Sequence, residues 1–254
     1  MSDAVLVDVE NGIMTVTINR AEQKNAANYA VAEAIAKAMD ELDSNPAMRV
    51  AIITGAGGNF CAGMDIKAYL KGELPIFEER GFAGVAQSPP TKPLIAAVEG
   101  YALAGGCELA LACDAIIASE EAQFGMAEVK RGMVAAGGGL LYLPRQIPQR
   151  LALEMAMTGD SISGKRAAEI GMINRAVPAG QALNGARELA KIIAKNAPLA
   201  VAASKRVVIE SQDWSRTEMF DKQSEILYPV FGSEDAIEGA QAFAEKREPQ
   251  WKSK

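Results

Sequence analysis

The chain has 254 residues, of which 49% are hydrophobic, 26 are Lys or Arg and 32 are Asp or Glu, and it contains no histidine. Without imidazole, Ser-His-Asp and Cys-His catalysis and His-ligated metal sites are excluded, so acid-base chemistry has to come from Asp, Glu, Lys, Tyr or Cys. The net charge of -6 argues against binding to nucleic acid or to an anionic membrane surface.

The first elements predicted are a hairpin, a helix and a buried strand. Val5, Val7 and Val9 alternate with Leu6, Asp8 and Glu10, and a β-branched run follows over 13–18. Asn11-Gly12 lies between these runs and is typical of a type I′ turn, so we expect an antiparallel hairpin. Apolar residues then recur at helical spacing over 27–42, and residues 49–54, with the apolar run 50–53 at their centre, predict a buried strand.

Strands and helices alternate in the middle of the chain. Residues 94–98 and 115–119 are short apolar runs that predict strands, and residues 105–112 between them predict a helix. This alternation indicates an α/β core with parallel pairing. The irregular stretch over 68–93 predicts a long loop, which is either a binding loop or a surface insertion.

The pattern becomes mostly helical beyond about residue 145. A helix is predicted over 146–157, ending at Gly159, and Ser163 is expected to cap a short helix that stops at Gly171. Residues 172–177 form the one predicted strand of this part, and Asn196-Ala197-Pro198 separates two further helices. We therefore expect an α/β core over 1–190 and a helical region over 191–254.

Glycine clusters are candidate binding segments. Gly55-Ala56-Gly57-Gly58 follows a predicted strand, but Phe60 stands where a dinucleotide fingerprint requires its third glycine, and no P-loop pattern occurs. Residues 60–65 and 100–108 also follow predicted strands, and the second segment opens a helix. Small residues there allow a substrate to approach two backbone N–H groups, which predicts an oxyanion hole. The same glycines would also suit tight turns and helix–sheet packing.

Two glutamates lie in unusually apolar surroundings. Most glutamates are solvated surface residues, but Glu108 lies within 104–112, where the other side chains are small or apolar, and Glu128 has apolar neighbours over 124–129. A carboxyl group in such surroundings tends to have a raised pKa, and two that share a site divide their protons. The pair could therefore supply both an acid and a base at neutral pH.

The N-terminal sequence and the cysteines indicate a cytoplasmic protein. Residues 1–5 lack a basic segment followed by an apolar run, so no secretory signal is expected. Charged residues interrupt the longest apolar stretch before it reaches about 18 residues, so no membrane span is expected. Three cysteines without a CxxC pair indicate reduced thiols.

Four segments together resemble the enoyl-CoA hydratase/isomerase, or crotonase, superfamily, and the resemblance covers nearly the full chain. They are residues 60–67 (FCAGMDIK), residues 95–114 with their GGCELA stretch, residues 122–128 (AQFGMAE) and the tail over 242–249 (AFAEKREP). The resemblance implies a spiral of ββα units with a helical C-terminal trimerisation region. It also implies an acyl-CoA thioester as the partner, in a homotrimer or homohexamer with no metal and no cofactor besides the CoA of the substrate.

The resemblance assigns roles to particular residues. Glu108 and Glu128 match the two catalytic glutamates, and the backbone N–H groups of Met64 and Gly105 match the oxyanion hole. The remaining matches fall where the family contacts CoA or substrate: Lys24, Ala62, Met64, Asp65, Ile66, Lys67, Gly105, Phe243 and Lys246. The acyl pocket is expected between residues 68–93 and the C-terminal helices.

Both glutamates together favour an enoyl-CoA hydratase, and the C-terminal sequence over 233–251 is most similar to the carnitinyl-CoA type. The alternatives are a Δ3,Δ2-enoyl-CoA isomerase that uses one glutamate and a non-catalytic acyl-CoA-binding protein. Two departures stand out: Ala127 replaces the usual proline before the second glutamate, and Ala135-Ala136 replaces Pro-Asp or Pro-Gly. The second departure removes the acid of dienoyl-CoA isomerases and argues against that activity.

Overall fold

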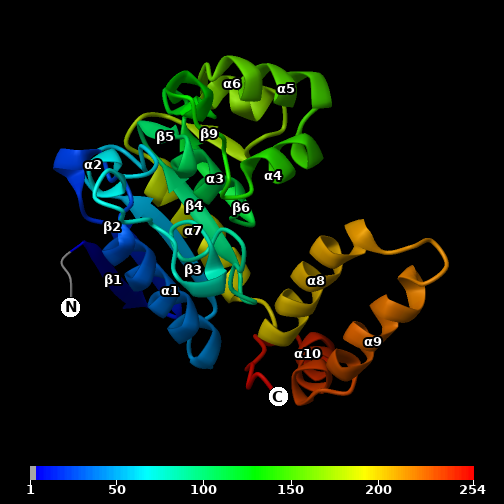
Figure 1. The fold of residues 1–254 in the computed structure, drawn as a ribbon. Helices are drawn as coiled ribbons and strands as arrows, with labels where there is room; N and C mark the ends of the chain where they lie inside the picture. Colours follow the sequence, from blue (N-terminus) through cyan, green and yellow to red (C-terminus); the bar gives the residue numbers. More distant parts are fainter. Residues whose placement is uncertain (1–3) are drawn as a thin grey trace.

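The computed structural model describes residues 4–254, and a six-stranded sheet runs through its centre (Figure 1). The strands lie in the order β1 (Val5–Glu10), β2 (Ile13–Ile18), β3 (Val50–Gly55), β4 (Leu94–Val98), β6 (Ala115–Ser119) and β9 (Arg175–Val177). β1 and β2 pair antiparallel, and every later pair is parallel, which confirms the predicted hairpin and the parallel core. The hairpin turn has φ of 51° at Asn11 and 76° at Gly12, as a type I′ turn requires.

Two layers of helix cover the main sheet. On β2 and β3, alternate residues point to opposite faces: Met14, Val16 and Ile53 belong to the core shared with α1 (Tyr29–Ser44), whereas Ile13 and Ile52 pack with α7 (Ala182–Ala194). α1 begins at Asn28, whose side chain accepts a hydrogen bond from the Val31 N–H, and its buried stripe has the predicted helical spacing. α7 lies against the sheet through three alanines, Ala182, Ala186 and Ala190.

A second, three-stranded sheet was not predicted. It consists of β5 (Tyr101–Leu103), β7 (Gln123–Gly125) and β8 (Ile162–Ser163), in that order. Gly100, at φ of 53°, turns the chain from β4 into β5, and α3 (Gly105–Leu111) follows at once. The β4-β5-α3 succession is a ββα unit of the kind that the crotonase resemblance implied. Strands of two or three residues are too short for an alternating pattern, so the sequence carried no signal for them.

The connecting helices bring both confirmations and corrections. Ser163 caps α6 (Gly164–Glu169) as predicted, and its hydroxyl accepts a hydrogen bond from the Arg166 N–H. The helix expected over 146–157 begins later, as α5 (Gln149–Thr158), because Pro148 stands just before it. A separate helix, α4 (Gly139–Gln146), precedes it and was missed because its glycines and Pro144 resemble a turn. The predicted strand over 172–177 was too long, since only β9 is extended.

The C-terminal helices project away from the two sheets (Figure 1). Pro198 is the first residue of α8 (Pro198–Glu210), so the predicted break at 196–198 is confirmed, and α9 (Met219–Phe231) and α10 (Glu234–Glu245) complete the group. The boundary expected at residue 190 lies inside α7. Among residues 4–254, no helix combines the length and the apolar character that a membrane span needs.

Candidate active site

Both candidate glutamates lie on the wall of one cavity of about 280 Å³. Glu108 is on α3 and is 3% exposed, and Glu128 is on a 3-10 helix (Ala127–Arg131) and is 9% exposed. The irregular loop over 68–93 contributes five of the residues around the cavity, which makes it a wall of the site. The full lining is Ala62, Met64, Ile66, Leu74, Pro75, Ile76, Phe82, Gln87, Ala104, Gly105, Glu108, Glu128, Arg131, Met133, Val134, Ala136 and Gly137.

Backbone donors hold the Glu108 carboxylate in place. Its Oε1 accepts hydrogen bonds from the N–H groups of Gly137 at 2.8 Å and Gly139 at 2.9 Å. Burial raises the pKa of Glu108, and these two donors counter the rise because they stabilise the charged form. A Cβ atom at either glycine would lie 2.8 Å from a Glu108 side-chain atom. The Gly137-Gly138-Gly139 segment therefore orients a catalytic candidate, a role that was not predicted.

Glu128 has a contrasting environment. Its Oε2 is buried and has no hydrogen-bond partner within the part of the chain that the structure describes. Burial raises the pKa of Glu128 to about 7, the negative charge of Glu108 adds to the rise, and Arg131 opposes it. Glu128 is therefore partly protonated at neutral pH and can donate a proton, whereas the two backbone donors favour the charged form of Glu108 that a general base requires.

The two predicted oxyanion-hole segments lie against each other. The Cys61 N–H donates to the Tyr101 carbonyl at 2.8 Å, and the Leu103 N–H donates to the Cys61 carbonyl at 3.1 Å. A Cβ atom on Gly106 would lie 2.0 Å from the Cys61 carbonyl oxygen, so only glycine permits this approach. The N–H groups of Met64 and Gly105 belong to these segments, both residues line the cavity, and neither N–H donates to another group within residues 4–254.

Backbone strain occurs next to this point. Ala104, directly before Gly105, has φ of 51° and ψ of -128°, a conformation that residues other than glycine rarely adopt. Such strain costs about 1–3 kcal/mol and concentrates at functional sites. The strained residue directly precedes Gly105, which lines the cavity and whose N–H donates to no group within residues 4–254.

The candidate CoA-contact residues fall into two groups. Ala62, Met64, Ile66 and Gly105 line the cavity, and Lys67 is exposed on the short helix α2 (Ile66–Tyr69) beside it. The Lys24 carbonyl accepts a hydrogen bond from the Ala62 N–H at 3.0 Å, and the Lys24 Nζ lies 4.7 Å from the centre of the Tyr101 ring. Phe243 and Lys246 lie elsewhere, at the end of α10, and neither lines the cavity.

Asp65 positions this region of the chain. One carboxylate oxygen accepts hydrogen bonds from the Lys67 and Ala68 N–H groups and caps α2, and the other forms an ion pair with Arg20 at 2.8 Å. Burial acts against ionisation, yet the hydrogen bonds from Arg20 and the backbone lower the pKa of Asp65. Both oxygens are therefore already engaged in fixing the loop that carries Met64.

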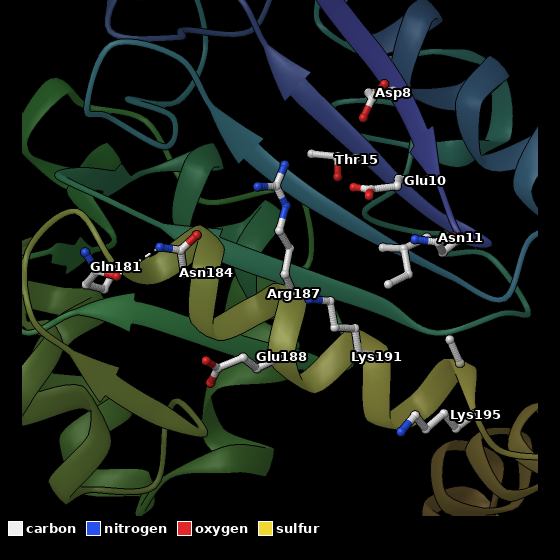
Figure 2. A pocket seen from close by; sticks show the side chains of 12 residues that line it. Asp8, Glu10, Asn11, Thr15, Gln181, Asn184, Arg187, Glu188, Lys191 and Lys195 are labelled. Carbon is white, nitrogen blue, oxygen red and sulfur yellow. Dashed lines mark hydrogen bonds between the residues drawn. The ribbon is translucent and has the colours of Figure 1, made fainter.

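A hollow of larger volume lies away from these residues. It is a surface groove of about 760 Å³ between the β1-β2 hairpin and α7, with Asp8 and Glu10 on the strand side and Arg187 and Lys191 on the helix side (Figure 2). It contains neither a buried carboxyl pair nor any predicted site residue. Within the described residues, no group of three or more His, Cys, Asp or Glu side chains is arranged to hold a metal ion.

Comparison with known proteins decides the family. A family model described as enoyl-CoA hydratase/isomerase matches residues 8–254. The chain belongs to the enoyl-CoA hydratase/isomerase family. It is 41% identical to carnitinyl-CoA dehydratase from Proteus mirabilis over the whole of both chains, and 41% identical to enoyl-CoA hydratase EchA19 from Mycobacterium tuberculosis over 98% of this chain and 96% of that one.

Solved structures of the family confirm the fold. An enoyl-CoA hydratase from Mycobacterium tuberculosis superposes with a TM-score of 0.98 at 54% identity, and EchA1 from Mycobacterium marinum with 0.97 at 54% identity, each over all of both chains. A carnitinyl-CoA hydratase from Mycobacterium avium, also covered completely, gives 0.79 at 41% identity. The predicted crotonase resemblance and the α/β spiral fold are thereby confirmed.

Proposed function

We propose that this family member is an enoyl-CoA hydratase, a lyase that adds water across the 2,3 double bond of an enoyl-CoA thioester. The observation that carries the proposal is the arrangement of two buried carboxyl groups of different proton affinity on the wall of one cavity. Met64 and Gly105 line the same cavity, and their N–H groups donate to no other group within residues 4–254. The relatives named enoyl-CoA hydratase and carnitinyl-CoA dehydratase support the same class of reaction.

In this mechanism, the thioester carbonyl oxygen accepts hydrogen bonds from the Met64 and Gly105 N–H groups. Glu108 takes a proton from a water molecule, whose oxygen forms a bond to Cβ while the π electrons move onto the thioester as an enolate. Glu128 then donates its proton to Cα, and the carbonyl re-forms. The enolate charge develops at the two N–H donors, which are fixed in place before the reaction and need no reorganisation.

The dual carboxyl arrangement favours hydration over isomerisation. A Δ3,Δ2-isomerase moves one proton between carbons and needs a single carboxyl, whereas water addition needs a base for water and an acid for Cα. Here both carboxyl groups line the same cavity. A second independent glutamate, oriented by two backbone donors, has no function in a pure isomerase.

We further propose that the chain forms a homotrimer or homohexamer, that it acts in the cytoplasm, and that it needs no cofactor besides the CoA of its substrate. Phe243 is 87% exposed and, with Lys246, lies away from the cavity of its own chain. A neighbouring copy in the oligomer would bring these two residues to the CoA moiety, beside Lys24 and the 62–67 segment. The free thiols of Cys61, Cys107 and Cys113 are consistent with a reducing compartment.

The test is an assay of 2-butenoyl-CoA hydration. The reaction is monitored by the loss of absorbance of the conjugated double bond, and the product is identified by mass spectrometry. We expect a product heavier by one water. Incubation with 3-butenoyl-CoA distinguishes the isomerase, which would yield 2-butenoyl-CoA without added water. Tight binding of CoA esters in calorimetry without turnover of any enoyl-CoA would instead identify a non-catalytic binding protein.

A further inference from the structure

A second hollow of about 460 Å³ adjoins the catalytic cavity on the far side of Glu128. We call it the α4-α5 groove because the 3-10 helix that carries Glu128, α4 and α5 form its walls. Glu128 and Val134 line both hollows, so the groove continues from the acid of the proposed reaction. The other lining residues are Met126, Val129, Ala135, Leu140, Leu143, Pro144, Gln149, Ala152, Leu153, Ala156 and Met157.

The groove is apolar and open to solvent. Apart from Glu128 itself, Gln149 is its only polar lining side chain. Val134, Leu153 and Met157 are 67%, 47% and 69% exposed, although the hydrophobic effect favours burial of such side chains. A contiguous exposed apolar surface of this kind marks a binding site for an apolar ligand or partner.

Small residues stand where the two hollows meet. Ala136 lines the catalytic cavity and the adjacent Ala135 lines the groove, so consecutive methyl groups face the two sides of the junction. Ala135 and Ala136 therefore contribute only methyl groups to the walls of the two hollows. The catalytic cavity alone, at about 280 Å³, lies at the low end of ligand-site volumes.

We propose that the α4-α5 groove binds the distal part of the acyl group, and that the substrate is an enoyl-CoA with a long or bulky apolar acyl chain. The inference rests on the proposed function, because it takes the double bond to lie between Glu108 and Glu128. It places the acyl site on α4 and α5, and not on the C-terminal helices that we expected from the sequence.

The chemistry of the groove argues against a betaine-type substrate. A trimethylammonium group is recognised by aromatic rings or by a free carboxylate. None of the groove's lining side chains is aromatic, and its single carboxyl group is Glu128, which the mechanism needs in its protonated form. The relative named carnitinyl-CoA dehydratase is 41% identical to this chain. The lining of the groove nevertheless suits a hydrocarbon chain better than a trimethylammonium group.

The experiment compares kcat/KM for 2-butenoyl-, 2-decenoyl- and crotonobetainyl-CoA in the full-length protein and in two groove variants, Leu153→Glu and Met157→Glu. Both positions are on the exposed face of α5, so the variants should fold. We expect each variant to lower kcat/KM for 2-decenoyl-CoA about tenfold or more and to leave 2-butenoyl-CoA within about twofold. Ile192→Glu, which places the same charge at a 57% exposed apolar position on α7, is the matched control and should change neither value.

Equal values for 2-decenoyl-CoA in the variants and the wild type would overturn the proposal. So would an equal loss for all substrates together with a smaller oligomer in gel filtration, because the groove would then be covered by a second copy of the chain. Preference of the wild type for crotonobetainyl-CoA over 2-decenoyl-CoA would also overturn it. If no enoyl-CoA is hydrated, the proposed function fails, but the groove can still be tested by calorimetry with decanoyl-CoA and butanoyl-CoA. Variants that lose affinity for decanoyl-CoA and keep their affinity for butanoyl-CoA would support binding of the acyl chain in the groove.

Discussion

The two glutamates show how neighbouring groups give identical side chains different proton affinities. Glu108 and Glu128 are both buried, and burial alone would favour the neutral form of each. Two backbone N–H donors from Gly137 and Gly139 shift Glu108 toward its charged form, while Glu128 has an unpartnered oxygen and faces the charge of Glu108. A chain without histidine thus obtains a group that titrates near neutrality from a carboxyl.

At the level of single residues, we first predict that Glu128→Gln lowers kcat for 2-butenoyl-CoA hydration by a factor of about 10²–10⁴, because the amide cannot supply a proton to Cα. The amide has nearly the same shape, so the affinity for butanoyl-CoA should change less than about threefold. Steady-state kinetics and calorimetry on the same preparation measure the two effects. A variant with wild-type turnover would remove Glu128 from the mechanism.

The second residue-level prediction concerns pH. In the proposed mechanism Glu128 acts in its protonated form, and its pKa is about 7, so kcat/KM for hydration should fall as pH rises through about 7. Glu108 and Arg131 are the charged groups that shift this value, in opposite directions. The residual activity of Glu128→Gln should lack this alkaline limb. A wild-type profile that stays flat between pH 6 and 9 would contradict the assignment.

At the level of elements, close packing fixes the start of α3. A Cβ atom on Gly105 would lie 2.4 Å from the Phe82 ring, so Gly105→Ala must displace either the ring or the oxyanion donor. We expect kcat to fall at least tenfold, since loss of a comparable donor costs about 3 kcal/mol. Phe82→Leu in the same chain should restore part of the activity. The control is Gly232→Ala, where no atom would lie nearer than 3.7 Å, and it should have wild-type kinetics.

The α2 cap offers a separate test of stability. Asp65→Ala removes two N-cap hydrogen bonds and leaves the half-buried Arg20 without its ion pair, so the free energy of unfolding should fall by about 1–3 kcal/mol. Glu33→Ala breaks an exposed pair with Lys37 and should lower the free energy of unfolding far less, because water screens the pair. Urea denaturation of both variants measures the difference. Equal losses would show that Asp65 does not anchor the loop.

The elements that the sequence predicted well are those with long local patterns. α1 has four turns of apolar spacing, and β4 and β6 are uninterrupted apolar runs, so burial alone determines them. β5 and β7 have three residues each, and what defines them is pairing between segments about twenty residues apart. Such short strands depend on contacts that no local window contains.

At the level of the whole molecule, the same distinction separates the predicted from the unpredicted parts of the site. The apolar surroundings of Glu108 and Glu128 and the family motifs were visible in the sequence. Other features arise only when distant segments meet in the fold. They are the contact of Phe82 with Gly105, the hydrogen bond from Gly137 to Glu108 and the apolar groove beyond Glu128. The candidate catalytic residues were therefore easier to predict from the sequence than the residues that would bind the acyl group.

The exposed aromatic side chains of the C-terminal helices lead to a last prediction. Phe220, Tyr228 and Phe231 on α9 are 70%, 71% and 73% exposed, an apolar surface that a stable monomer would normally bury. We expect light scattering to give three or six times the chain mass of 26.8 kDa. Phe231→Glu should yield a smaller species with weaker binding of CoA esters, because the neighbour's Phe243 and Lys246 would no longer reach the CoA.

Ile192→Glu again serves as the control in that experiment, since it puts the same charge on an exposed apolar position of α7. It should keep both the mass and the affinity of the wild type. A wild-type monomer with full hydratase activity would contradict the prediction, because a complete CoA site would then exist within one chain. If Phe231→Glu dissociated but bound CoA esters normally, α9 would serve assembly while Phe243 and Lys246 had no part in binding.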